Sequence, residues 1–240
     1  MTSSGLDESM RYDLKDTRGD EQQTVACLAR LAGQCKALEL AIGTGRIALP
    51  LAAAGVSVDG IEMSRHMIER MREKPGGGAI TVTTKDMSRV GTGRTYGMVS
   101  LVYNTIGNLL TQVDQVRCFQ NAARHLDDDG VFVIECSVPT APARPGHQFV
   151  DAERIDVDHV VLDVCRYDPV SQILDENHVH ISSGGVVLRP IRVRLAHPPE
   201  FDLMARIAGL RLRHRWAGWD AEPFTATSRR HISVYERLQP

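Results

Sequence analysis

Residues 37–46 read Ala-Leu-Glu-Leu-Ala-Ile-Gly-Thr-Gly-Arg. The first half of this stretch predicts a buried strand that carries one acid, Glu39, and the second half predicts a loop around Gly43 and Gly45. A helical pattern follows at once, over residues 47–54. Glycine lets the backbone approach a ligand closely and take turns that a Cβ would forbid. A strand, a glycine loop and a helix in this order predict a ligand site at the carboxyl ends of parallel strands.

A second acid, Glu62, lies at the end of the next predicted strand, 17 residues beyond Gly45. Its two carboxylate oxygens match the two hydroxyls of a ribose, so the layout predicts an adenosine-type pocket. Gly43, Gly45 and Ala48 also fit the G-x-G-x-x-A pattern of dinucleotide-binding folds. These residues therefore leave two classes of cofactor open, a dinucleotide and another cofactor that contains an adenosine.

Strand patterns alternate with helical patterns as far as residue 137, which predicts a doubly wound α/β sheet. The first helix is expected at residues 21–31, and Ser64 and Asp114 are expected to cap two later helices. Residues 127–130 are expected to form a turn before the fifth strand. The strands of this part are expected at residues 37–41, 56–61, 80–83, 98–103 and 131–136.

The pattern changes at Pro139, and residues 156–196 contain no helical pattern. Turn residues at 168–169 and 183–185 divide this segment into strands. Alternation would place Val160, Leu162 and Val164 on one apolar face, and such a face usually covers another surface. We therefore expect an inserted antiparallel sheet with strands at residues 157–166, 172–182 and 186–195.

Helical spacing returns at residues 201–208, and strands are expected at residues 210–216 and 231–237. The predicted organisation has three parts. They are an N-terminal arm with a cofactor-binding α/β core at residues 1–139, an antiparallel insertion at residues 140–197 that forms a substrate lid or a dimer contact, and the last helix with two core strands at residues 198–240.

The chain has 240 residues, 42% of them apolar, and a formal net charge of −2. This charge favours neither nucleic acid nor an anionic membrane, so we expect a small-molecule substrate. The polar N-terminus lacks a secretory signal, and no apolar run approaches the roughly 20 residues that span a bilayer, so we expect a cytoplasmic protein. We also expect it to be a monomer or a homodimer. Five dispersed cysteines without C-x-x-C spacing predict neither a disulfide framework nor a structural zinc site.

Residues 39–45, Glu-Leu-Ala-Ile-Gly-Thr-Gly, resemble motif I of the class I S-adenosylmethionine-dependent methyltransferases, E/D-x-G-x-G-x-G, with Ala41 in place of the first glycine. The resemblance covers residues 12–137 and 200–237 and is closest to the small-molecule branch found in bacterial natural-product pathways. It implies a Rossmann-like seven-stranded sheet with an antiparallel last strand. It also implies S-adenosylmethionine as cofactor and methyl transfer to N, O or S of a small molecule, expected to be a secondary metabolite.

The resemblance further implies which residues bind the cofactor. Motif I would approach its methionine part, Glu62 its ribose and Asp86 its adenine amine. Tyr103 and Asn104 would lie where the substrate meets the reactive methyl group, and Tyr12 would close the pocket. The implied cofactor site consists of Tyr12, Glu39, Ala41, Gly43, Gly45, Glu62, Met63, Met67, Asp86, Met87, Tyr103 and Asn104.

Methyl transfer is an in-line displacement at a sulfonium, so positioning and desolvation of the nucleophile can supply most of the acceleration. A general base is optional, and the sequence does not identify a catalytic residue. His147, Tyr167 and His178 are candidates for that role because they lie in or near the insertion. His178 and His180 share one strand face, but the sequence offers no third ligand, so no metal is expected.

Two other functions remain open on the sequence. The first is a nicotinamide-dependent oxidoreductase on a dinucleotide fold, which lacks support from a Tyr-x-x-x-Lys pair and which an antiparallel seventh strand would exclude. The second is a non-catalytic cofactor-binding subunit, whose only support is Ala41 in motif I.

Overall fold

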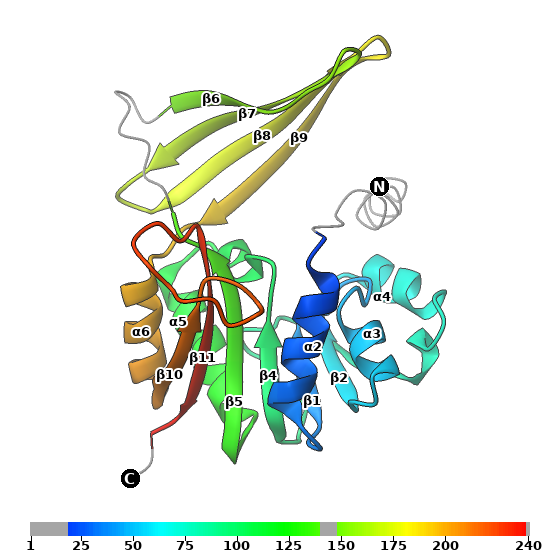
Figure 1. Ribbon diagram of the computed structural model, residues 1–240, viewed down its shortest axis with the longest axis vertical. Coiled ribbons are helices and arrows are strands. Elements are labelled where there is room, and N and C mark those ends of the chain that lie inside the picture. The colour runs from blue at the N-terminus through cyan, green and yellow to red at the C-terminus, as the bar shows by residue number, and fades with distance from the viewer. Residues whose placement is uncertain (1–18, 140–147, 239–240) are drawn as a thin grey trace.

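The computed structural model describes residues 19–139 and 148–238 (Figure 1). Tyr12 and His147 of the predicted site lie outside these ranges. The described part of the chain forms two sheets, a seven-stranded core sheet and a four-stranded sheet that stands off one end of the core. No helix among the described residues is long and apolar enough to cross a membrane.

The core sheet has the strand order β10-β11-β5-β4-β1-β2-β3. Its neighbouring strands are parallel, except that β11 runs antiparallel to both β10 and β5. The prediction of a Rossmann-like seven-stranded sheet with an antiparallel last strand is therefore confirmed. The strands are β1 (Ala37–Leu40), β2 (Val58–Glu62), β3 (Thr81–Thr84), β4 (Tyr96–Leu101), β5 (Leu126–Ser137), β10 (Leu210–Trp216) and β11 (Arg230–Arg237).

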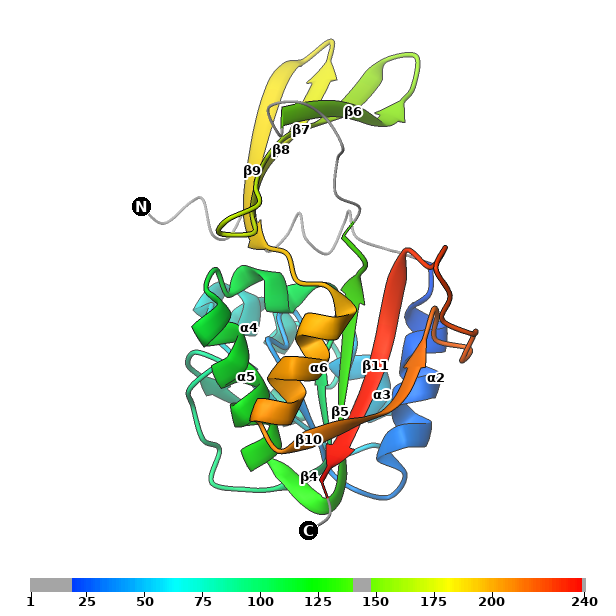
Figure 2. The ribbon, with the colours of Figure 1, turned by 90° about the vertical axis from the view of Figure 1, so that its left-hand side faces the viewer.

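Helices cover both faces of this sheet. Helices α5 and α6 lie together on one face, where Phe119, Phe201 and Tyr235 pack into a single core (Figure 2). Helices α2 and α3 contribute Leu28 and Leu51 to the core of the other face. A parallel sheet that is covered in this way presents its ligand site at the carboxyl ends of its strands. The helices are α2 (Glu21–Ala32), α3 (Ala48–Ala53), α4 (Arg65–Arg72), α5 (Gln112–Arg124) and α6 (Pro198–Ile207), with 3-10 turns η1 (Gly77–Ala79) and η2 (Thr105–Asn108).

Two local predictions in the core are wrong. Asp114 does not cap α5, because the hydroxyl oxygen of Thr111 accepts from the Asp114 backbone N–H at 3.1 Å. Asp114 lies in the first turn, and its carboxylate accepts from the Thr111 hydroxyl at 2.7 Å, so its side chain supports the capping residue. Residues 127–130 form no separate turn, because strand β5 begins at Leu126 and includes them.

The inserted sheet follows β5 and leads into α6. Its strands are antiparallel in the order β6-β7-β8-β9, which confirms the predicted antiparallel insertion. The prediction missed β6, whose residues 151–155 are exposed on both faces and so show no apolar alternation. The strands are β6 (Gln148–Ile155), β7 (His159–Asp168), β8 (Ile173–Ser182) and β9 (Gly185–Arg194).

The two faces of the inserted sheet carry different side chains. One face presents the paired residues Phe149, Cys165, Glu176 and Ile191. We call it the inner face, because Glu176 and Ile191 also line a cavity against the core. The opposite, outer face carries the predicted apolar row that includes Leu162.

Candidate functional site

The loop between β1 and α3 contains three residues in the left-handed conformation, Ala41 (φ 53°), Gly43 (φ 58°) and Gly45 (φ 76°). A Cβ at Gly45 would lie 2.6 Å from the Met71 side chain, so this position requires glycine. At Gly43 a Cβ would meet only the Ala41 carbonyl oxygen, at 3.9 Å, so the space beside this backbone is open. Ala41 adopts the left-handed conformation at a cost of roughly 1–2 kcal/mol. The loop therefore forms without the first glycine of the motif.

Glu39 lies under this loop with 4% of its surface exposed. Burial raises the pKa of its carboxyl group to about 8, and Arg46 and the Ala48 backbone N–H oppose that effect. Its Oε2 has no hydrogen-bond partner among the described residues, and a buried acceptor of this kind calls for a donor. The Arg46 guanidinium stacks on the Tyr103 ring at 4.2 Å from the centroid, which connects this loop to the end of β4.

Glu62 ends β2, and its carboxylate accepts three backbone hydrogen bonds. Oε2 accepts from the Gly43 N–H at 2.9 Å. Oε1 accepts from the N–H groups of Met63 and Ser64 at 2.9 and 2.8 Å. A carboxylate offers about four acceptor positions, so about one remains for a ribose hydroxyl. Glu62 thus fixes the glycine loop against β2, a structural role that the sequence analysis did not predict.

The residues predicted to contact adenine lie near the ends of β2 and β3. Met63 is 74% exposed and Met67 is half-buried on α4. Asp86 caps the turn after β3, because its Oδ1 accepts from the backbone N–H and the hydroxyl of Ser88, both at 2.8 Å. Met87 is buried in the core under α5, where it packs in the cluster that includes Phe119.

Tyr103 and Asn104 follow β4 in the left-handed conformation, with φ of 61° and 59°. Two non-glycine residues in this conformation store strain, which is common at ligand sites. The Tyr103 N–H donates to Oε2 of the buried Glu135 at 3.0 Å, and Asn104 Oδ1 accepts from the Ser137 N–H at 2.5 Å. Strand β5 thus holds this pair in place through Glu135, a residue that the sequence analysis missed.

A cavity of about 570 Å³ lies between the core and the inserted sheet. Of the predicted cofactor residues, Tyr103 and Asn104 line it, together with Arg46 and Cys136 from the core. The inner face of the inserted sheet completes the wall with Leu174, Glu176, Ile191 and Val193. The cavity therefore joins the end of β4 to the insertion, and it lies next to the glycine loop through Arg46.

The candidates for a catalytic base lie on the inserted sheet. Tyr167 is half-buried near the base of β7. The Nδ1 of His178 lies 2.6 Å from an Asp163 oxygen and 3.3 Å from a Glu153 oxygen. Ligand atoms of Glu153, Asp163 and His178 lie within 4.8 Å of one another, so these residues could hold a metal ion, although the sequence analysis expected no metal.

The base of the inserted sheet is anchored by Arg194, which the sequence analysis missed. Arg194 is 4% exposed and donates to the side-chain oxygens of Gln115, Gln172 and Glu200. Gln115 in turn donates to the Ile106 carbonyl oxygen at 3.2 Å, in the turn that follows Asn104. An arginine in an otherwise alternating strand gives no sequence signal of burial, because charged residues at strand ends are usually exposed.

Comparison with known proteins places the chain among methyltransferases. A family model described as a methyltransferase domain matches residues 37–130. The chain is 34% identical to the CcbJ methyltransferase from Streptomyces caelestis, over 92% of this chain and 90% of that one, with a TM-score of 0.85. It is 28% identical to the cypemycin N-terminal methyltransferase of a Streptomyces species, over 83% of this chain and 82% of the relative. CalS10, an amino pentose methyltransferase from Micromonospora echinaspora, shares the fold at 20% identity, covering 97% of this chain and 96% of its own, with a TM-score of 0.68.

Proposed function

The chain belongs to the class I S-adenosylmethionine-dependent methyltransferases, and we propose that it methylates a nitrogen atom of a small molecule in a natural-product pathway. Two relatives support nitrogen as the acceptor atom. One is described as an N-terminal methyltransferase and the other as an amino pentose methyltransferase, and both act on compounds that carry an amine by those descriptions.

The residues after β1 and β2 fit the cofactor. The open space beside Gly43 admits a ligand against the backbone, and the buried Oε2 of Glu39 offers an acceptor without a partner among the described residues. We propose that Gly43 and Gly45 approach the methionine part, that Glu62 accepts from one ribose hydroxyl, and that Met63 covers the adenine. When bound, S-adenosylmethionine supplies a methyl group that its sulfonium already activates, so the protein needs to orient the acceptor and exclude water.

The observation that best supports the location of methyl transfer is the cavity between the core and the inner face. Tyr103 and Asn104, held in a strained conformation by Glu135 and Ser137, form its floor. Leu174 and Val193 of the inserted sheet form its opposite wall. We propose that residues 140–197 act as the substrate lid, because the inner face is the part of the insertion that lines this cavity.

The two alternative functions find less support. The antiparallel β11 between β10 and β5 is the feature that excludes a dinucleotide-binding oxidoreductase. The non-catalytic alternative relied on Ala41, and the loop forms with Ala41 in the conformation that a glycine would take.

Two measurements test the proposal. Titration calorimetry should show that S-adenosylhomocysteine binds and that NADH does not. Mass spectrometry should then detect transfer to members of a panel of matched acceptors, amino sugars beside their hydroxyl counterparts and peptides with free beside acetylated N-termini. Methylation of the amine member of a pair supports nitrogen transfer, whereas methylation of the hydroxyl members alone contradicts it.

A further inference from the structure

The inner face of the inserted sheet carries three side chains that can ligate a metal, Glu153 of β6, Asp163 of β7 and His178 of β8. The Nδ1 of His178 lies 2.6 Å from an Asp163 oxygen and 3.3 Å from a Glu153 oxygen. The Asp163 and His178 side chains are about three-quarters buried, with 22% and 25% of their surface exposed. Three neighbouring strands therefore each direct one ligand atom towards a common point.

A β-bulge in β6 brings Glu153 into this group. The register between β6 and β7 shifts between Ala152 and Arg154, so Glu153 is the extra residue on β6. A bulge re-aims the side chain of its extra residue, and bulges are frequent beside functional sites. Here the Glu153 carboxylate is turned towards Asp163 and His178, which are directly opposite each other on β7 and β8.

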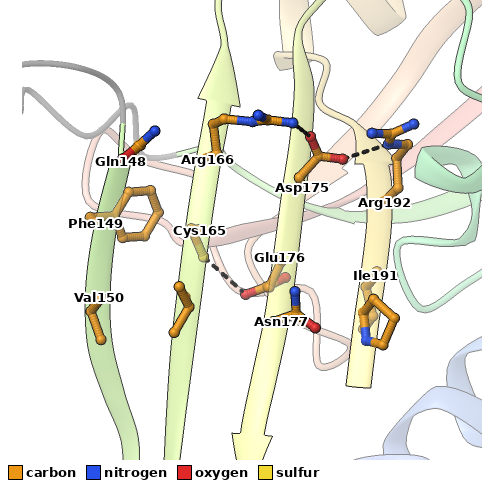
Figure 3. A pocket seen from close by; sticks show the side chains of 12 residues that line it. Gln148, Phe149, Val150, Cys165, Arg166, Asp175, Glu176, Asn177, Ile191 and Arg192 are labelled. Atoms are coloured by element: carbon orange, nitrogen blue, oxygen red, sulfur yellow. Dashed lines mark hydrogen bonds and ion pairs between the residues drawn. The ribbon is translucent and has the colours of Figure 1, made fainter. Parts of the chain in front are cut away.

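The surrounding part of the inner face is crowded with carboxylates. Asp151 of β6 is directly opposite Asp163, and like charges in this position destabilise a sheet. Glu176 lies two residues before His178 on the same face of β8, where its Oε1 accepts from the Cys165 thiol at 3.6 Å (Figure 3). Three adjacent strands thus place four acids on one face, Asp151, Glu153, Asp163 and Glu176.

The basic side chains of this region do not balance these acids. Arg154 of β6 is paired with Asp156 at 2.5 Å. Arg189 of β9 is directly opposite His178 and supplies one positive charge. When the four carboxylates are ionised, Arg189 and a protonated His178 together still leave two negative charges in excess. A divalent cation at the common point of the three ligands compensates this charge.

We propose that Glu153, Asp163 and His178 bind a zinc ion. One imidazole nitrogen with two carboxylate oxygens suits Zn²⁺, whereas Mg²⁺ and Ca²⁺ prefer oxygen ligands alone. In a tetrahedral zinc site the ligand atoms lie about 3.3 Å apart, which is the distance between His178 and Glu153. The Asp163 oxygen, at hydrogen-bond distance from Nδ1, would move outward by less than about 1 Å. The ion takes the place of the proton between Nδ1 and the carboxylates, and water fills the fourth position.

The ion would give the inserted sheet a cross-link that its packing does not provide. Among the described residues of β6–β9, only Val161, Cys165 and Arg194 are buried, so this sheet has little hydrophobic core of its own. Small units of this kind often depend on a structural metal or a disulfide. Zinc would join β6, β7 and β8 on the face that continues, through Glu176, into the wall of the cavity. His178 would then be a metal ligand and not a catalytic base.

Titration of the full chain with zinc chloride tests the site. The parent protein carries no histidine tag, is treated with EDTA, and contains Cys35→Ser, because the exposed Cys35 could bind zinc by itself. Calorimetry should show one Zn²⁺ per parent chain, and the ion should raise the melting temperature. His178→Gln and Asp163→Asn should each weaken Zn²⁺ binding at least about tenfold and abolish this rise.

His66→Gln is the matched control. The Nδ1 of His66 lies 3.6 Å from a Glu69 oxygen on α4, so this variant also removes a histidine beside a carboxylate, but outside the inserted sheet. It should bind Zn²⁺ as the parent protein does. S-adenosylhomocysteine affinity should be unchanged in every variant, which shows that each is folded. With Co²⁺ in place of Zn²⁺, the visible spectrum should show tetrahedral coordination without a thiolate band, so that Cys165 is not a ligand.

Three outcomes would overturn the proposal. The first is a parent protein that does not bind one Zn²⁺ per chain. The second is equal Zn²⁺ affinity in the parent protein, His178→Gln and Asp163→Asn, because the ion would then be held elsewhere. The third is equal weakening by His66→Gln and His178→Gln, which would show adventitious binding to surface histidines.

Discussion

The core sheet and the inserted sheet differ in how they bury their side chains. Strand β1 is buried at every position, and β4 at nearly every one, because helices cover both faces of the core. Among the described residues of β6–β9, only Val161, Cys165 and Arg194 are buried. The core sheet is therefore covered by the protein's own helices. The inserted sheet has no such cover on its faces among the described residues, and we propose that its inner face contacts the acceptor.

Gly43→Val should cause the largest loss, because it acts on the cofactor loop of the core. A β-branched residue at φ 58° is strained, and its side chain would fill the open space beside the loop. We expect S-adenosylhomocysteine binding to disappear in calorimetry, while circular dichroism shows a folded protein. Normal binding by the folded variant would show that the cofactor does not pass this loop.

Arg194→Met should lower the unfolding free energy by weakening the contact between the inserted sheet and the core. Removing the buried guanidinium leaves Glu200 without its counter-charge, although the amides of Gln112 and Gln172 still donate to it, and leaves two amide oxygens without this donor, at a cost of up to about 3–5 kcal/mol. Chemical denaturation should show this loss of unfolding free energy. Arg211→Met, which breaks an exposed pair with Glu236, is the control and should cost less than about 1 kcal/mol. Similar losses in both variants would show that Arg194 does not anchor the insertion.

Glu62→Ala should weaken cofactor binding by roughly 1.5–3 kcal/mol, because it removes a charge-assisted hydrogen bond to the ribose and frees the Gly43 N–H from the loop. Glu62→Gln separates these effects, because the amide keeps an acceptor for the loop without the charge. Unchanged affinity in both variants would remove Glu62 from the site.

Burial of Glu39 should make stability depend on pH. Its pKa is about 8 in the folded protein, above the 4.5 of an exposed glutamate, so the folded state binds more protons between these values. Stability should therefore fall as the pH rises from about 5 to 8, by up to about 1.4 kcal/mol per pH unit. Glu39→Gln should flatten this slope when unfolding is measured at several pH values. An identical slope in wild type and variant would contradict the assignment.

Ala41→Gly should have the smallest effect. Glycine adopts the left-handed conformation without the steric cost of a Cβ, so unfolding free energy should rise by about 1 kcal/mol or stay unchanged after the entropy of the unfolded chain is included. Cofactor affinity should stay the same or improve. A clear loss of affinity would show that the Ala41 methyl group contacts the ligand.

The contrast between the sheets also explains what the sequence could predict. A strand that is buried on both faces needs a continuous run of apolar residues, so the strands that carry Leu38, Val99 and Val133 could be predicted from the sequence. The glycine loop beside them could be predicted as well. In the inserted sheet, β6 was missed because its exposed residues show no alternation. Glu176, Arg194 and Glu135 act through partners that are distant in sequence, such as Cys165, Gln115 and Tyr103. No local pattern marks such contacts.

The cap of α5 shows a smaller limit. Thr111 and Asp114 both favour the first turn of a helix, and the choice between them depends on which backbone N–H the side chain reaches. The role of Glu62 in holding Gly43 likewise follows from the position of β1 beside β2, which sequence spacing alone does not give.

The central claim is that the core sheet binds the cofactor and the inserted sheet selects the acceptor. Steady-state kinetics of Glu62→Ala and of Leu174→Ala, which shortens a side chain of the cavity wall, tests this division most directly when both substrates are varied. The account predicts that Glu62→Ala raises the KM for S-adenosylmethionine and leaves the acceptor KM within about twofold, whereas Leu174→Ala lowers kcat/KM for the amine and leaves the S-adenosylmethionine KM unchanged. Equal effects of each variant on both substrates would contradict it.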